Sequence, residues 1–241
     1  MCNLYSVTKG QQPIRDAFRV MVDRAGNMPP LPAIFPDQMA PVVRHGADGR
    51  ELAMLRWGFP SPPGVPGNRA VTNIRNTGSS YWRSWMQPAY RCLVPVTAFC
   101  DYASGKPAMP QPGKPAMSQS GKPAMPHWFA LGEDRPLLAF AGLWRPWSGV
   151  RGTKAGPAEG EHHLFAFLTC EPNAVVAPIH PKAMPVVLTT SGECDAWMTA
   201  PIADALLLQR PLADGTLSVV ARSDKQDPPA APPAMKQALL L

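Results

Sequence analysis

Short apolar runs, separated by clusters of Gly, Pro, Asn and Asp, most strongly limit the fold of this chain. Their Val, Phe, Trp and Leu content is typical of strands. Helical patterns are few and scattered, so the order does not alternate as in βαβ units. The sequence therefore predicts a single α+β domain that is mainly β. The runs that predict strands are residues 38–45, 51–59, 91–99, 127–131, 136–144, 163–169 and 217–221.

Helices are predicted in three places. Residues 13–25 repeat apolar side chains at helical spacing. Thr190 and Glu193 form a capping-box pattern that opens a helix through residue 197. Pro at the first position predicts a further helix over residues 201–208.

Turns and loops follow from Gly and Pro. Asp48-Gly49 predicts a hairpin, and residues 133–134 predict a second turn between strands. The stretches 59–68 and 154–161 are rich in Gly and Pro and predict surface loops.

One insertion and a tail interrupt this domain. Residues 105–125 repeat GKPAM three times, a composition that cannot pack a core and predicts a flexible loop insertion. The segment DPPAAPPA predicts a Pro-rich tail. We therefore expect one domain over residues 1–222, with the insertion inside it, and a tail over residues 223–241.

Composition limits the class of protein. A chain of 241 residues can bury a substantial core, so its size requires no disulfide or structural metal. Its five cysteines include no C-x-x-C pair, which argues against a disulfide framework and a zinc ribbon. No signal peptide or membrane span is apparent, so we expect a cytoplasmic protein. The net charge of +6 favours an anionic partner.

Cys2 has chemistry that depends on its position. Its small side chain permits removal of Met1, which would leave an α-amine and a thiol on adjacent carbons, with ordinary pKa values of about 8 and 8.5. Such an amine can condense with an aldehyde to an imine, and the thiol can close on the same carbon to give a thiazolidine. Cys2 could equally be an amidohydrolase nucleophile with its own amine as base, or merely the second residue.

Polar and aromatic side chains in one segment suit a nucleic acid. Asn73 and Arg75 would share one face of an extended strand, where the guanidinium can bind phosphate. Trp82, Arg83 and Trp85 interleave rings with a cation. This pattern can stack on bases, and it also occurs where a helix buries its tryptophans.

Two further side chains are candidates for proton transfer. Asp101 follows the apolar run RCLVPVTAFC, and a carboxylate at such a strand end can act as a general acid or base. His180 precedes a Pro-Lys pair and a further apolar run, the most structured setting of any histidine in the chain.

Together these segments resemble the SOS response-associated peptidase (SRAP) family. The likeness rests on the initial Met-Cys, the WGFP segment that starts at Trp57, Asn73-Ile74-Arg75, RCLVPVTAFCDY and IHPKAMPVVL, in this order from residue 2 to about 198. The resemblance implies twisted sheets with a barrel-like core and short peripheral helices.

The resemblance also implies a function. Cys2 would lie in a positive cleft that binds single-stranded DNA and would attack the ring-opened aldehyde of an abasic site, leaving a stable DNA-protein crosslink. The family is associated with autocatalytic removal of Met1, and lyase activity or crosslink reversal could follow. The implied partner is single-stranded DNA with abasic sites. We expect no cofactor, metal or membrane, a monomer, and association with the nucleoid once crosslinked.

The resemblance also implies a role for each residue that matches the family pattern. Cys2 would supply amine and thiol, Asn73 would orient the sugar or the amine, and Arg75 would hold a phosphate, while Asp101 and His180 would move protons. Further DNA contacts are expected from Trp57, Trp82, Arg83, Trp85 and Lys182.

The sequence departs from the family pattern in two places. Asn3 and Leu4 stand where the family commonly has Gly-Arg. Asp101 stands where it commonly has Glu and is shorter by about 1.5 Å, so we expect trapping to survive better than reversal. Two alternatives stay open: an N-terminal-nucleophile hydrolase with His180 as base, and a non-catalytic binder of single-stranded nucleic acid.

Overall fold

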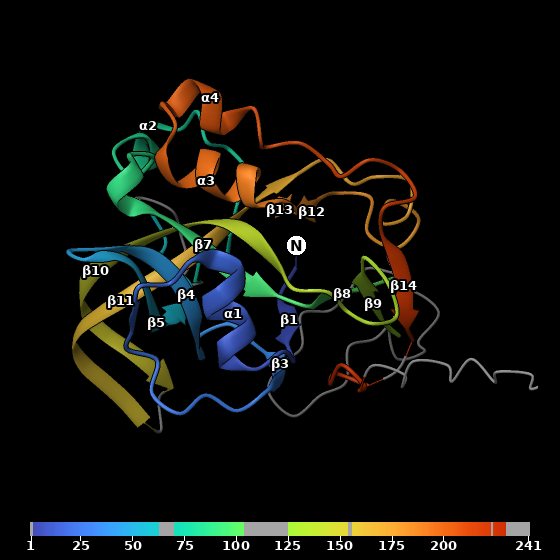
Figure 1. Ribbon diagram of the computed structural model, residues 1–241, viewed down its shortest axis with the longest axis horizontal. Coiled ribbons are helices and arrows are strands. Elements are labelled where there is room, and N and C mark those ends of the chain that lie inside the picture. Colours follow the sequence, from blue (N-terminus) through green and yellow to red (C-terminus); the bar gives the residue numbers. More distant parts are fainter. Residues whose placement is uncertain (1, 63–69, 104–124, 154–155, 223, 230–241) are drawn as a thin grey trace, which may run out of the picture.

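The protein forms two sheets with short helices outside them (Figure 1). Of the predicted GKPAM insertion at 105–125, all but the last residue lies outside the described residues. The same holds for much of the predicted tail at 223–241. The computed structural model describes residues 2–62, 70–103, 125–153, 156–222 and 224–229.

The larger sheet closes on itself. Because β11 pairs in parallel with β5 as well as antiparallel with β10, the strands β5, β4, β7, β10 and β11 form a ring, and the predicted barrel-like, mainly β fold is confirmed. The short strands β13 (Val187–Leu188) and β6 (Asn73–Ile74) attach to β10 and β11. The order along this sheet is β12 (Met184–Pro185), β11 (Gly156–Cys170), β10 (Leu138–Thr153), β7 (Arg91–Val96), β4 (Met39–Gly46), β5 (Gly49–Trp57) and β2 (Val22–Asp23).

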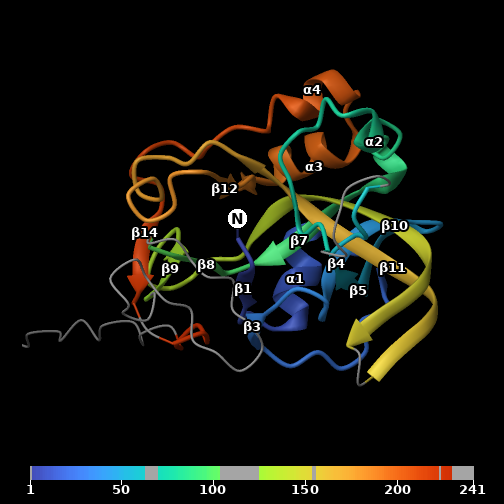
Figure 2. The ribbon, with the colours of Figure 1, turned by 180° about the vertical axis from the view of Figure 1, so that it is seen from behind.

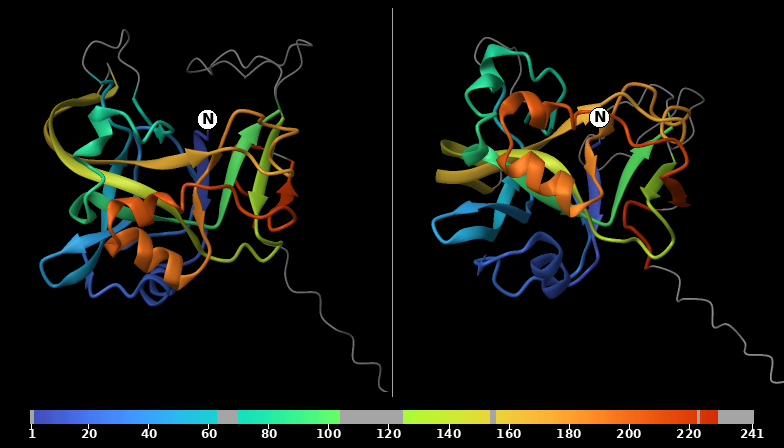
Figure 3. Two further views of the ribbon diagram at one scale, coloured as in Figure 1. Left: turned by 90° about the horizontal axis from the view of Figure 1, so that it is seen from above. Right: turned by 45° about the horizontal axis from the view of Figure 1, so that its top comes forward.

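The smaller sheet stands beside the barrel (Figures 2 and 3). Its strand β1 carries Tyr5, whose buried ring meets the barrel aromatics Trp57 and Phe140 at centroid distances of 5.1 and 5.7 Å. The strand that follows Cys2 is therefore fastened to the main core by large apolar contacts. The order is β14 (Ser218–Ala221), β9 (Pro126–Ala130), β8 (Ala98–Tyr102), β1 (Leu4–Val7) and β3 (Leu31–Ile34).

The predicted strand at 91–99 is two strands. It breaks at Thr97, whose main-chain N–H donates to Ser6 O on β1 at 2.8 Å. The chain thus leaves the barrel after β7 and joins the smaller sheet as β8. This crossing places Asp101 on β8, beside the strand that begins just after Cys2.

The first helix is shorter than predicted. We expected residues 13–25, but α1 spans Gln11–Phe18 and ends where Arg19 takes a left-handed backbone with φ 52°. The main-chain N–H of Met21 then donates to Arg50 O at 2.8 Å, and the next two residues form β2. Pairing with β5 therefore ends the helix well before its apolar periodicity does.

The other helices agree better with the sequence. In α3 (Ser191–Thr199) both hydrogen bonds of the predicted capping box between Thr190 and Glu193 are present. The helix expected over residues 201–208 is α4 (Ile202–Leu206), which ends earlier. A 3-10 turn spans Pro88–Tyr90, and α2 spans Ser80–Arg83.

Two turn predictions have different outcomes. The hairpin near Asp48-Gly49 is confirmed, because β4 and β5 pair up to Gly46 and Gly49. The loop predicted at 154–161 is wrong, since β11 begins at Gly156 and pairs with β10 along its length. Most side chains described in this outer part of β11 are exposed, so main-chain pairing maintains a strand that shows no apolar pattern.

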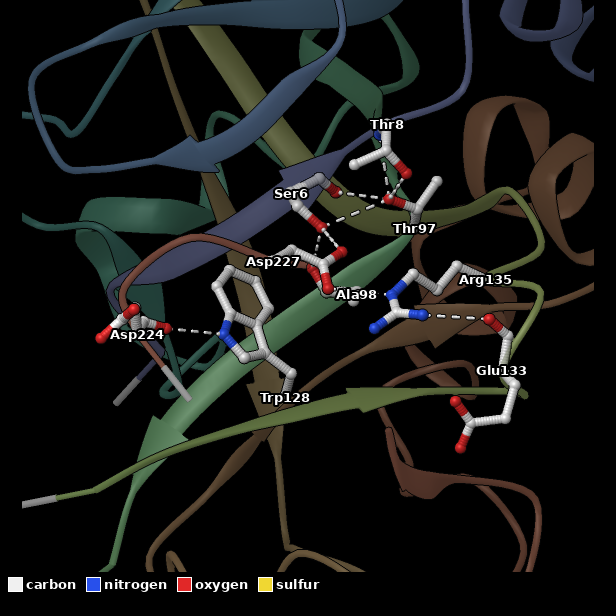
Figure 4. A network of polar contacts seen from close by, with 9 residues as sticks. All are labelled: Ser6, Thr8, Thr97, Ala98, Trp128, Glu133, Arg135, Asp224 and Asp227. Atoms are coloured by element: carbon white, nitrogen blue, oxygen red, sulfur yellow. Dashed lines mark hydrogen bonds and ion pairs between the residues drawn. The ribbon is translucent and has the colours of Figure 1, made fainter. Parts of the chain in front are cut away.

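Part of the predicted tail belongs to the folded domain. Asp227 is buried, and its main-chain N–H donates to Pro32 O on β3 at 2.9 Å. Its carboxylate accepts from Ser6 Oγ at 2.7 Å and from Arg135 Nε at 2.8 Å (Figure 4). Trp128 also donates to the main-chain oxygen of Asp224 at 3.1 Å. Residues 224–229 are thus held by buried polar contacts rather than forming a free tail.

Candidate functional site

Three separated segments meet around Cys2. Asn73 lies on β6, which pairs in parallel with β11 so that Asn73 stands opposite Phe167. Asp101 lies on β8, where the neighbouring Cys100 stands opposite Leu4 of β1. His180 lies between β11 and β12. Pairing of strands far apart in sequence brings these side chains together.

Asn73 holds the main chain of Cys2. Its Nδ2 donates to Cys2 O at 2.8 Å and to Thr72 Oγ1 at 2.8 Å. The Thr72 hydroxyl in turn donates to Asn3 Oδ1 at 3.0 Å. Thr72 was missed by the sequence reasoning, although its place beside Asn73 was a usable signal. The side chains of Asn73 and Thr72 together hold Cys2 and Asn3 in place.

Buried Asp101 pairs with partly buried His180. Nδ1 of His180 lies 3.0 Å from Asp101 Oδ2 and 2.9 Å from Ala183 O. Because both neighbours are acceptors, Nδ1 carries a proton. Asp101 Oδ1 accepts from the main-chain N–H of Tyr102 at 3.0 Å. The carboxylate therefore orients the imidazole, as in other acid-base pairs.

The Cys2 thiol is held in its neutral form. The side chain is buried, and Sγ lies 3.4 Å from Leu4 O. Burial, followed by the negative charge of Asp101, raises the pKa of the Cys2 thiol to about 12. At neutral pH the sulfur therefore carries its proton and is a weak nucleophile.

One buried oxygen at the site, Asn73 Oδ1, has no hydrogen bond among the described residues. Asp101 Oδ2 already lies against His180 Nδ1 at 3.0 Å. An unsatisfied buried acceptor costs free energy. Asn73 Oδ1 is thus available to a donor that enters near Cys2.

Arg75 is engaged with the protein. Its Nη1 donates to Cys170 O at 2.8 Å and to Lys182 O at 3.0 Å, and Nη2 forms an ion pair with Glu171. The guanidinium therefore braces the segment that carries His180. The sequence predicted phosphate binding here and did not foresee these partners.

The residues predicted to touch DNA differ in exposure. Trp57 is fully buried in the barrel and donates from Nε1 to Thr72 O at 3.1 Å, so its ring has no face for a base. Trp82 on α2 is buried as well, whereas Arg83 and Lys182 are exposed. Trp85 is partly buried and lies under the Arg145 guanidinium at 4.0 Å. The buried tryptophans thus have packing roles.

No helix in the described part of the chain is both long and apolar enough to cross a membrane.

Solved structures share this fold. A protein from Bordetella bronchiseptica is 24% identical, with a TM-score of 0.65, covering 90% of this chain and 97% of its own. A protein from Bacteroides thetaiotaomicron is 18% identical, with a TM-score of 0.61 and 90% of each chain covered. A phage-related protein from Bordetella bronchiseptica is also 18% identical, with a TM-score of 0.61, covering 90% of this chain and 92% of its own.

Sequence comparison identifies the family. A comparison with curated proteins found no match. The family described as SOS response associated peptidase (SRAP) matches residues 1–223, which is most of the chain. The chain therefore belongs to the SOS response associated peptidase (SRAP) family.

Proposed function

We propose that the protein is a sensor of abasic sites that binds single-stranded DNA and crosslinks to it through Cys2 after Met1 is removed. The observation that carries this proposal is a pair of contacts at one site: Asn73 Nδ2 donates to Cys2 O, and His180 Nδ1 lies against Asp101 Oδ2. An aldehyde trap needs an N-terminal amine, a thiol and a proton relay. These residues supply all three once Cys2 is the first residue.

The first step would form an imine. The freed α-amine of Cys2 attacks the aldehyde carbon of the ring-opened sugar, and the resulting carbinolamine loses its hydroxyl as water after protonation. The unpartnered acceptor Asn73 Oδ1 can orient the amine, because the N–H groups of the amine are donors. His180 can carry the proton to the leaving hydroxyl.

The second step would close the ring. Sγ of Cys2 bonds to the imine carbon while the thiol proton passes to the imine nitrogen, giving a thiazolidine. Reversal, or strand cleavage by β-elimination from the imine, would use the same Asp101–His180 pair.

The alternative hydrolase is less well supported. A cysteine that attacks an amide must become a thiolate early in the reaction. Burial and the nearby Asp101 carboxylate oppose that ionisation by raising the thiol pKa. The site therefore suits trapping of a reactive aldehyde better than attack on a stable amide.

The test uses single-stranded DNA with one abasic site. The full chain is incubated with it and run on a denaturing gel, and the intact mass of the adduct is measured beside Cys2→Ala. We expect a heat-stable adduct that starts at Cys2 and is absent from the variant. Cys194→Ala is the matched control, because Cys194 is also buried but lies on α3.

Two results would refute the proposal. One is a wild-type protein that has lost Met1 but forms no adduct. The other is an adduct that persists in Cys2→Ala. His180→Gln tests the relay separately and should slow adduct formation by about 10²–10⁴-fold.

A further inference from the structure

The guanidinium of Arg75 is held by neutral groups on one side. Nη1 donates to two main-chain oxygens, Cys170 O at 2.8 Å and Lys182 O at 3.0 Å. The main chain of Arg75 is fixed too, because its carbonyl oxygen accepts from Gln209 Nε2 at 2.9 Å. These contacts position the cation without neutralising its charge.

The other side of the guanidinium faces a carboxylate. Nη2 pairs with Glu171, whose side chain is 73% exposed, while that of Arg75 is 42% exposed. An ion pair this exposed contributes little to stability, since water screens it. Glu171 can therefore leave Arg75 at small cost, and the main-chain contacts still hold the cation.

We propose that Glu171 occupies the place of a DNA phosphate on Arg75, and that the incoming phosphate displaces it. Carboxylate and phosphate oxygens are both acceptors that a guanidinium fork binds. Lys182 adds a second cation, because its main chain touches Arg75 and its side chain is exposed. Glu171 thus lowers the affinity for single-stranded DNA.

This inference rests on the proposed function for its ligand, but not on the covalent step. It is therefore tested with intact single-stranded DNA, which has no aldehyde to trap. A labelled oligonucleotide is titrated with the wild type and with Glu171→Gln at low salt, and anisotropy gives the dissociation constants. Without the competing carboxylate, we expect about two- to fivefold tighter binding. The gain should shrink as salt rises.

The control separates local competition from overall charge. Glu159→Gln removes the same charge from an exposed position in the outer part of β11 and should leave the affinity nearly unchanged. Equal tightening in both variants would overturn the inference, and so would no tightening in Glu171→Gln. A wild type that binds intact DNA but forms no adduct at an abasic site would refute only the proposed covalent function.

Discussion

The buried ion pair between Arg135 and Asp227 gives the sharpest stability prediction. Their side chains are 2% and 0% exposed, and Nε lies 2.8 Å from Oδ1. In Asp227→Ala, the hydrogen bond that Arg135 keeps among the described residues is the one to Glu133 O, and Ser6 loses its bond to the carboxylate. Leaving one charge of a buried pair without its partner costs about 3–5 kcal/mol.

Urea unfolding, monitored by tryptophan fluorescence, measures this cost. A loss of about 3–5 kcal/mol corresponds to a fall in Tm of roughly 6–20 °C for a chain of this size. Asp224→Ala is the matched control. Its side chain is exposed and its hydrogen bond to Trp128 uses the main-chain oxygen, so we expect a change within about 0.5 kcal/mol.

A double variant distinguishes the loss of charge pairing from general damage. Replacing both partners by apolar residues, Arg135→Met with Asp227→Leu, leaves no charge unpaired and should recover most of the stability. The reasoning fails if Asp227→Ala costs less than about 1 kcal/mol. It also fails if the double variant is no more stable than the single one.

Three further predictions concern burial. A Cys2 thiol with a pKa of about 12 should react with iodoacetamide at pH 8 about 10³-fold more slowly than a free cysteine, and an equal rate would contradict its burial. Burial raises the pKa values of the Cys2, Cys170 and Cys194 thiols from 9.0 to about 12, so the folded protein keeps these protons at pH values where the unfolded chain loses them. The free energy of unfolding should therefore fall as pH rises from 9 towards 12. Urea unfolding at pH 8 and 10 would measure this fall. Trp57→Ala should lose about 3–5 kcal/mol of stability; unchanged stability with weaker DNA binding would instead favour the DNA-contact role.

Features with local causes were predictable from the sequence. The capping box needs only Thr190 and Glu193, three positions apart, and both of its hydrogen bonds are present. The hairpin between β4 and β5 depends on a few residues around Gly49. Apolar runs predicted the strands because burial of one face requires them. Local rules failed where a distant partner intervened, as at Thr97 and in the outer part of β11.

The sequence alone determined the chemistry open to Cys2, because an amine and a thiol on adjacent carbons need no fold to define them. It also determined the residue types of the proposed relay and predicted the mainly β class. Tertiary structure alone decided that His180 faces Asp101, that Arg75 pairs with Glu171, and that Asp227 is buried. The reason is physical: a side chain's partners and its desolvation depend on segments far away in sequence, whereas propensity and capping act within about four residues.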